Sequence, residues 1–241
     1  MCSSDLLGGF GSGKTWIAVD VLTTHCNNEY AKEMAAKAAG IPYVPKLAIY
    51  ANYEGSIDGI RFRSLASSGQ MPLNSVKEFV TKNVPLSTRD SYKEYELNVY
   101  KHLRSDDLKY SETERFDRAK RILGRYARLL DMSGAVSKIG SGFVEELAEQ
   151  VNKIVKTTNM KVGVVIVDYV KLMADRYAML KGDKTDSLRT FIRRSPEMLS
   201  RQIGLKWNCV VFALHQLSGE ANTKAPHAPL NHAMEIGRAH V

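Results

Sequence analysis

The sequence predicts an α/β protein with a mostly parallel central sheet, flanked by helices and carrying one helical insertion. Short apolar runs that suit buried strands alternate with longer segments of helical periodicity, which favours a parallel sheet covered on both faces. A glycine-rich loop near the start runs directly into one of these helices. No change of composition marks a boundary. Residues 6–235 are therefore interpreted as a single domain, with the insertion at about 70–126.

The first half of the domain is expected to hold two helices and a strand. A helix over residues 15–35 begins directly after the glycine loop, and prolines within 40–45 break the chain before the next element. Residues 47–53 are apolar with partial alternation, as expected for a strand, and residues 57–67 repeat apolar side chains at helical spacing. Polar, mixed residues follow from about 70 to 110, where we expect irregular helix.

The second half continues the alternation. Ser111 and Glu114 form a capping-box pattern that opens a helix ending near residue 126, and a short strand follows over 127–132. The remaining elements are an amphipathic helix, a buried strand, a helix interrupted by Pro196 and a final buried strand, over residues 143–156, 162–167, 187–203 and 209–214.

Both tips of the chain, residues 1–5 and 236–241, look foreign to the domain. Codons that can encode residues 2–5 are the reverse complement of codons for the middle of 236–241, and the shared string resembles a sequencing adapter. We therefore expect a truncated gene fragment with non-native tips. In that case only Leu6 and Leu7 remain of the strand that should precede the glycine loop.

The bulk composition suits a globular protein with an anionic partner. Of the 241 residues, 44% are hydrophobic and 25% are charged, and the net charge is +8. A basic balance favours nucleic acid, although a solvated basic surface explains the charge equally well. No apolar run is long enough to span a bilayer, so no membrane partner is expected, and no signal peptide is visible. Three cysteines without metal-like spacing favour an intracellular protein.

The glycine-rich loop matches the phosphate-binding pattern G-x-x-x-x-G-K-[ST]. Its glycines let backbone N–H groups turn toward phosphate oxygens, and the following helix points its positive end at the same anion. Lys14 is expected to reach the β- and γ-phosphates, and the Thr15 hydroxyl to bind Mg²⁺. The residues expected to bind ATP are Gly8, Gly9, Phe10, Gly11, Ser12, Gly13, Lys14 and Thr15.

Three other strand ends carry polar side chains that this chemistry needs. Asp168 ends the apolar run 164–167, and such an acid beside a P-loop holds the magnesium. Glu54 follows the strand at 47–53 and suits a general base that polarises the attacking water, although alone it would be an ordinary loop glutamate. Gln216 follows the last strand and suits a sensor of the γ-phosphate, although alone it is simply a loop residue. His215 is interpreted as a structural or surface residue rather than a ligand.

Taken in order, these strings resemble the ATPase domain of DnaB-type replicative helicases, within the RecA-like P-loop superfamily. The matching strings are Gly11–Thr15, Asn52–Glu54, Val165–Met173 and Ala213–Ser218. The third is the most specific, because the family's run there is close to I-V-I-D-Y-L-Q-L-M. The resemblance covers nearly all of residues 6–235. It implies a RecA-like fold and an ATP-hydrolysing helicase motor that uses Mg²⁺. Glu54 is then the catalytic base, Lys14 and Gln216 act at the γ-phosphate, and Thr15 and Asp168 are the magnesium residues.

The resemblance also implies partners. Such motors act in replication as homo-oligomers, usually hexameric rings, that translocate on single-stranded DNA in the cytoplasm of a bacterium or a phage-infected host. Loops after Asp168 and Gln216 would line the channel. The basic residues expected to grip DNA phosphates there are Arg176, Lys181, Lys184 and Lys224, with Arg61, Arg63, Arg193 and Arg194 as alternatives.

Some features depart from the family. Segments near 28–46 and 70–110 are longer than usual, which suggests a divergent phage or plasmid ATPase, and His215 stands where the family usually has Ser. The family's arginine finger and amino-terminal domain lie outside this chain, so we expect weak hydrolysis by these residues alone. Two alternatives stay open. One is a RecA-like recombinase or helicase loader, and the other is a nucleotide-dependent assembly switch without motor activity.

Overall fold

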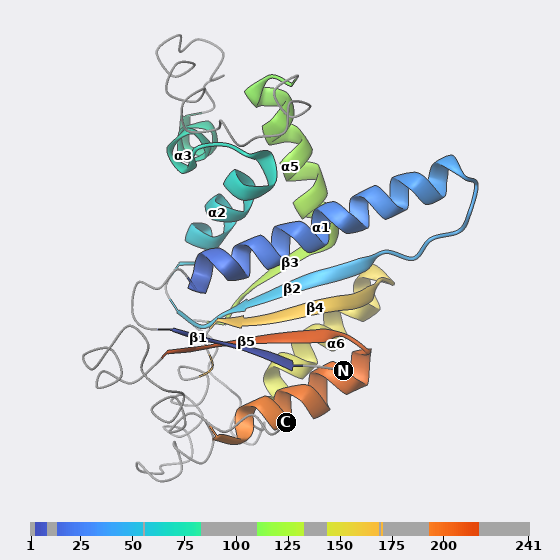
Figure 1. The fold of residues 1–241 in the computed structure, drawn as a ribbon, viewed down its shortest axis with the longest axis vertical. Helices are drawn as coiled ribbons and strands as arrows, with labels where there is room; N and C mark the ends of the chain where they lie inside the picture. The colour runs from blue at the N-terminus through green and yellow to red at the C-terminus, as the bar shows by residue number, and fades with distance from the viewer. Residues whose placement is uncertain are drawn as a thin grey trace.

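The computed structural model describes residues 3–8, 14–54, 56–82, 110–132, 144–168, 170 and 193–216. Within these ranges helices and strands alternate as the sequence predicts (Figure 1). The strands are β1 (Ser3–Gly8), β2 (Lys46–Asn52), β3 (Ala127–Asp131), β4 (Lys161–Asp168) and β5 (Val210–Gln216). The helices are α1 (Lys14–Ala38), α2 (Ile57–Gly69), α3 (Leu73–Lys82), α5 (Glu112–Tyr126), α6 (Glu145–Thr158) and a helical segment over residues 193–207.

The strands form one sheet in the order β1-β5-β4-β2-β3, and every neighbouring pair is parallel. Helices connect the strands along the chain, as parallel pairing requires, because the chain must cross back before each new strand. The predicted α/β class, with a parallel sheet flanked by helices, is therefore confirmed. The arrangement is compatible with a RecA-like fold.

The sheet is covered on both faces, as its apolar strands predict. Figure 1 shows α1 on one side of the sheet, and α6 with the 193–207 segment on the other. Alternation along β2 sends Ala48 and Tyr50 into the core beneath α1, whereas Leu47 and Ile49 enter the core beneath α6. We call these sides of the sheet the α1 face and the α6 face.

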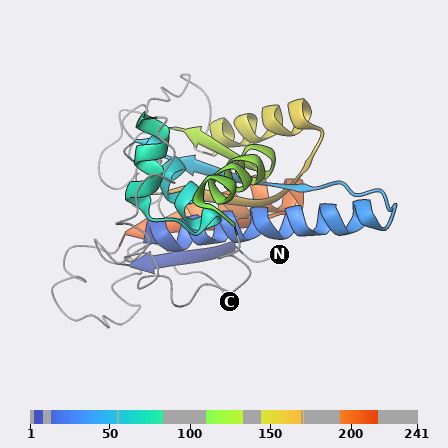
Figure 2. The same cartoon turned by 90° about the horizontal axis from the view of Figure 1, so that it is seen from above.

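The insertion adds helices α3 and α5 on the α1 side. They pack there with α2, which precedes the insertion, around a small apolar cluster that includes Leu65, Met71 and Ala119 (Figure 2). α5 begins with the predicted capping box: the Ser111 hydroxyl accepts from the Glu114 N–H, and the Glu114 carboxylate accepts from the Ser111 N–H at 2.8 Å. Residues 83–109 of the insertion lie outside the described residues.

Two elements differ from expectation. β1 is a six-residue strand over Ser3–Gly8 rather than the remnant Leu6–Leu7, and it pairs with β5 along its whole length. Parallel pairing uses backbone groups, so the small and polar residues Ser3–Asp5 extend the strand regardless of their origin. The last helix runs without a break through Pro196. Its irregularity is a π-helical turn over Ser200–Leu205, and it continues to residue 207 rather than ending at 203.

Candidate functional site

The residues predicted from the sequence gather at one edge of the sheet. Parallel strands all end at the same edge, and in the observed register Asn52 lies opposite Asp168 while Gly8 lies opposite Gln216. α1 starts at Lys14 beside this edge (Figure 1). One edge of the sheet therefore holds the amino end of α1 together with the carboxyl ends of β1, β2, β4 and β5.

Asp168 is the buried acid of the site. It lies on the α1 face, is 6% exposed, and its Oδ2 accepts a 2.5 Å hydrogen bond from the Tyr50 hydroxyl. Burial raises the pKa of the Asp168 carboxyl, while Tyr50, the positive charges of Lys14 and Arg63, and the Thr15 hydroxyl, which hydrogen bonds to it, favour the ionised form. Four neighbouring groups thus favour the ionised form of Asp168, which burial disfavours.

Lys14 stands at the first turn of α1, half-buried, with acidic groups near its ammonium. Burial lowers the pKa of Lys14, and the negative charges of Asp168 and Glu54 oppose that shift. The amino end of α1 also holds backbone N–H groups without helical partners, which attract anions. A cation and a helix amino end at the same point suit a ligand with several negative charges.

Glu54 follows β2 and its side chain is exposed. The backbone just before it is held by two hydrogen bonds: the Tyr53 N–H donates to the Asp168 carbonyl at 2.6 Å, and the Met132 N–H donates to the Asn52 carbonyl at 2.8 Å. Glu54 is near enough for its charge to act on Lys14 and on Tyr50. An exposed carboxylate on an anchored backbone suits contact with water and with a ligand.

Arg63 of α2 belongs to the site, although the sequence suggested it as a DNA contact. Its charge acts on both Asp168 and Tyr50, and its guanidinium carbon lies 5.7 Å from the centre of the Trp16 ring. Trp16 follows Thr15 and is 44% exposed. The sequence signal was weak, because only the packing of α2 against α1 brings Arg63 to this edge.

Tyr50 was also missed by the sequence reasoning. It is fully buried, and burial together with the nearby Asp168 charge and their hydrogen bond raises its pKa. The available signal was strand alternation, which places Tyr50 and Asn52 of β2 on the same face as Asp168. Predicting the contact would have required the register between β2 and β4.

The oxygen donors at the edge fit a magnesium ion. Mg²⁺ prefers oxygen ligands and in nucleotide sites takes one or two protein ligands, with phosphates and water completing its shell. The Thr15 hydroxyl and the Asp168 carboxylate supply such donors side by side. Within the described ranges no group of three or more His, Cys, Asp or Glu side chains forms a self-sufficient metal site. A magnesium held jointly with phosphates therefore suits this donor set.

Several predicted residues lie at the ends of the described ranges or outside them. Gly8 ends β1 and Gln216 ends β5, and both are described by their backbone alone. The loop residues Gly9, Phe10, Gly11, Ser12 and Gly13 lie outside the described residues. The same holds for the proposed DNA contacts Arg176, Lys181, Lys184 and Lys224.

The two described cysteines and His215 are buried in the core. Burial raises the pKa of Cys26 to about 12 and that of Cys209 to about 11, so both thiols are protonated at neutral pH. His215, interpreted from the sequence as a structural or surface residue, is 1% exposed, and alternation along β5 places it on the α6 face with Val211 and Ala213. None of the three suits nucleophilic chemistry at the edge.

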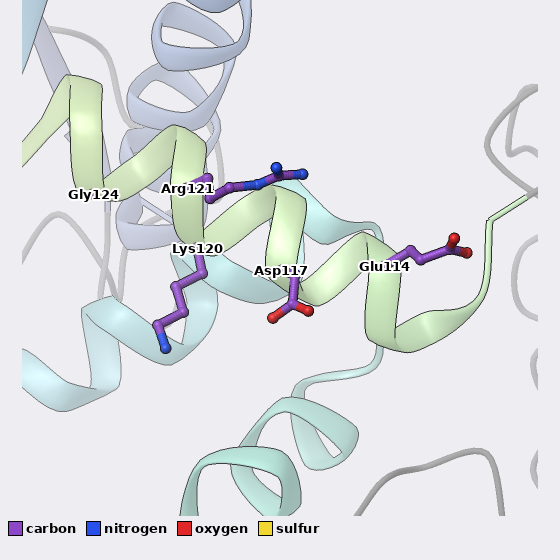
Figure 3. A pocket seen from close by; sticks show the side chains of 5 residues that line it. All are labelled: Glu114, Asp117, Lys120, Arg121 and Gly124. Carbon is purple, nitrogen blue, oxygen red and sulfur yellow. The ribbon is translucent and has the colours of Figure 1, made fainter.

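A hollow on the surface of α5 is separate from this edge. Figure 3 shows it lined by Glu114, Asp117, Lys120, Arg121 and Gly124. These residues all come from one helix, and the charges of both signs lie on its outer side. The lining lacks the converging elements that surround Asp168.

Comparison with known proteins adds no family assignment. A scan against protein-family models and a search of curated proteins both found no match to the chain. Within the described ranges, no helix has the length and apolar character needed to cross a bilayer.

Proposed function

We propose that this chain binds ATP with Mg²⁺ at the carboxyl edge of its sheet and hydrolyses it as the motor domain of a DnaB-like DNA helicase. One observation carries the proposal. Lys14, Thr15, Glu54 and Asp168 come from three separate segments of the sequence, and their side chains meet at one edge beside the amino end of α1. The motif order that suggested a RecA-like ATPase thus agrees with a spatial cluster.

Each side chain has a defined part in the proposed hydrolysis. Lys14 and the amino end of α1 bind the phosphates and offset charge that builds on the γ-phosphate. Glu54 orients the attacking water and accepts its proton. Thr15 and Asp168 would hold Mg²⁺, which when bound neutralises charge on the β- and γ-phosphate oxygens. Gln216 ends the neighbouring strand β5, where a polar side chain can respond to the γ-phosphate.

The first test is nucleotide binding by the whole chain. A fluorescent ATP analogue should bind in the presence of Mg²⁺, and Lys14→Ala should weaken binding at least tenfold, a loss of about 1.4 kcal/mol. Lys37→Ala is the matched control, because Lys37 is an exposed lysine in the last turn of the same helix. Equal affinity of the Lys14 variant and wild type would refute the proposed phosphate site.

The second test separates a motor from the alternatives. Glu54→Ala should abolish turnover and spare binding, and single-stranded DNA should stimulate the turnover of the wild-type protein. Unwinding of a forked duplex supports the helicase. Stimulation without unwinding would indicate a recombinase or loader, and turnover that ignores DNA would indicate an assembly switch.

A further inference from the structure

The hydroxyl of Tyr50 is a polar group inside an otherwise apolar part of the core. The side chain is fully buried beneath α1, in the cluster that includes Val19, Leu22 and Ile166. A buried tyrosine hydroxyl needs a partner, and this one ends on Asp168 Oδ2 at 2.5 Å. In the sheet register, Tyr50 lies opposite Ile166, two residues before Asp168. The ring therefore leans along the strand by roughly 7 Å to reach the carboxylate.

We propose that Tyr50 is a positioning residue for Asp168, which fixes one carboxylate oxygen so that the other serves the magnesium. This inference rests on the proposed function of the edge. A carboxylate on a short side chain can rotate and present either oxygen. The bond from the Tyr50 hydroxyl engages Oδ2, and in this proposal Oδ1 serves the ion and its water. Partners that hold a metal ligand in this way usually change metal affinity roughly 10–100-fold when they are removed.

Tyr50 is itself held firmly enough to fix the orientation of the Asp168 carboxylate. Its backbone is paired with β4 on one side and with β3 on the other, where it lies opposite Leu129. The ring is packed on all sides, so its hydroxyl has little freedom to follow a moving carboxylate. Thr15 approaches the same carboxylate from α1. Asp168 is thus held from the sheet by Tyr50 and from the helix by Thr15.

The test is Tyr50→Phe with Tyr126→Phe as a matched control. Tyr126 is also fully buried in the cluster beneath α1, and its hydroxyl also bonds a carboxylate, that of Glu33. Each variant loses one hydroxyl-to-carboxylate bond and keeps the ring. Mn²⁺ affinity of the chain with bound ATP, read by electron paramagnetic resonance, should fall about tenfold or more in Tyr50→Phe and less than twofold in Tyr126→Phe.

Nucleotide binding in EDTA provides a second readout. It should be the same within about twofold in wild type and Tyr50→Phe, because the hydroxyl acts through the metal ligand. In an Asp168→Asn background, adding Tyr50→Phe should cause no further loss of Mn²⁺ affinity. If the phenylalanine variant fails to fold by circular dichroism, Tyr50→Met takes its place, since methionine adapts to irregular core space.

The outcomes distinguish this inference from the proposed function. If wild type with ATP binds no Mn²⁺, both the function and the inference are overturned. If Asp168→Asn loses Mn²⁺ and Tyr50→Phe keeps wild-type affinity, the magnesium site stands and the positioning role of Tyr50 is overturned. Equal losses in Tyr50→Phe and Tyr126→Phe would overturn it as well, because the effect would then be a general consequence of disturbing the core.

Discussion

Glu29 of α1 is a buried carboxylate that ties the helix to the chain entering β2. Its side chain is 2% exposed. Its Oε2 accepts from the Tyr43 hydroxyl at 2.7 Å and from the Lys46 N–H at 2.8 Å, while Oε1 accepts from Lys32 Nζ at 3.0 Å. The connection over residues 39–45 is thereby fastened to the helix. Since β2 leads to the candidate site, this contact supports the site from its far end.

Replacing this carboxylate by Glu29→Gln should lower the free energy of unfolding by about 2 kcal/mol at pH 7. The amide oxygen can keep the two bonds at Oε2, but each loses its charge assistance, worth about 1 kcal/mol. The amide nitrogen then faces Lys32, whose side chain is 60% exposed and can turn into water, at a cost of ~0.5 kcal/mol or less. Urea denaturation followed by circular dichroism measures the loss.

The loss should depend on pH in a defined direction. Burial alone would raise the pKa of Glu29, but the hydrogen bonds from Tyr43, Lys46 and Lys32 outweigh it and hold the pKa below its usual 4.5. Stability from the ionised form is therefore fully present above pH 4.5 and is lost as the pH falls through the folded value. The difference between wild type and Glu29→Gln should shrink below pH 4.5. A difference that stays constant from pH 7 to pH 3 would refute this reasoning.

Three shorter predictions concern other parts of the fold. Asp168→Asn should raise the urea midpoint of the metal-free chain at pH 7, because burial holds the Asp168 pKa above 3.8; the gain should vanish below that pH. Gly163→Ala should lower the free energy of unfolding by about 1–3 kcal/mol in the same assay, since the added Cβ would lie 2.7 Å from His25 Nε2. Ser111→Ala removes the cap of α5 and should cost about 1 kcal/mol by thermal unfolding, with an unchanged midpoint as the contrary result.

The elements were predictable because their signals are local. A buried strand such as β4 reads as an unbroken apolar run, and the capping box of α5 needs only Ser111 and Glu114 at fixed spacing. The predicted ends of β2, β3 and α2 fall within two residues of the observed ones. The sequence also predicted four site residues, because each lies at the end of a strand or the start of a helix, and parallel pairing brings these ends to a single edge. They are Lys14, Thr15, Glu54 and Asp168.

What the sequence did not predict depends on register and on packing between elements. The order β1-β5-β4-β2-β3 places β5 beside β1, although the two strands lie about two hundred residues apart, and no local pattern carries that pairing. Tyr50 meets Asp168 only because β2 and β4 pair in one particular register. Arg63 reaches the site because α2 packs on α1, so it was interpreted as a surface charge for DNA.

The register that brings Tyr50 to Asp168 depends on one extra residue in β4. Leu47 lies opposite Val162, but Ala48 lies opposite Val164, so Gly163 is a bulge. Side chains alternate along a strand, and one added residue exchanges the two faces beyond it. Val162 can therefore enter the core beneath α6 while Val164, Ile166 and Asp168 face α1. Without the bulge, keeping Val162 in its core would turn Asp168 away from Lys14. Glycine suits this position because the ring of His25 occupies the space that a side chain would need. The bulge near the start of β4 thus determines which face Asp168 occupies at the end of the same strand.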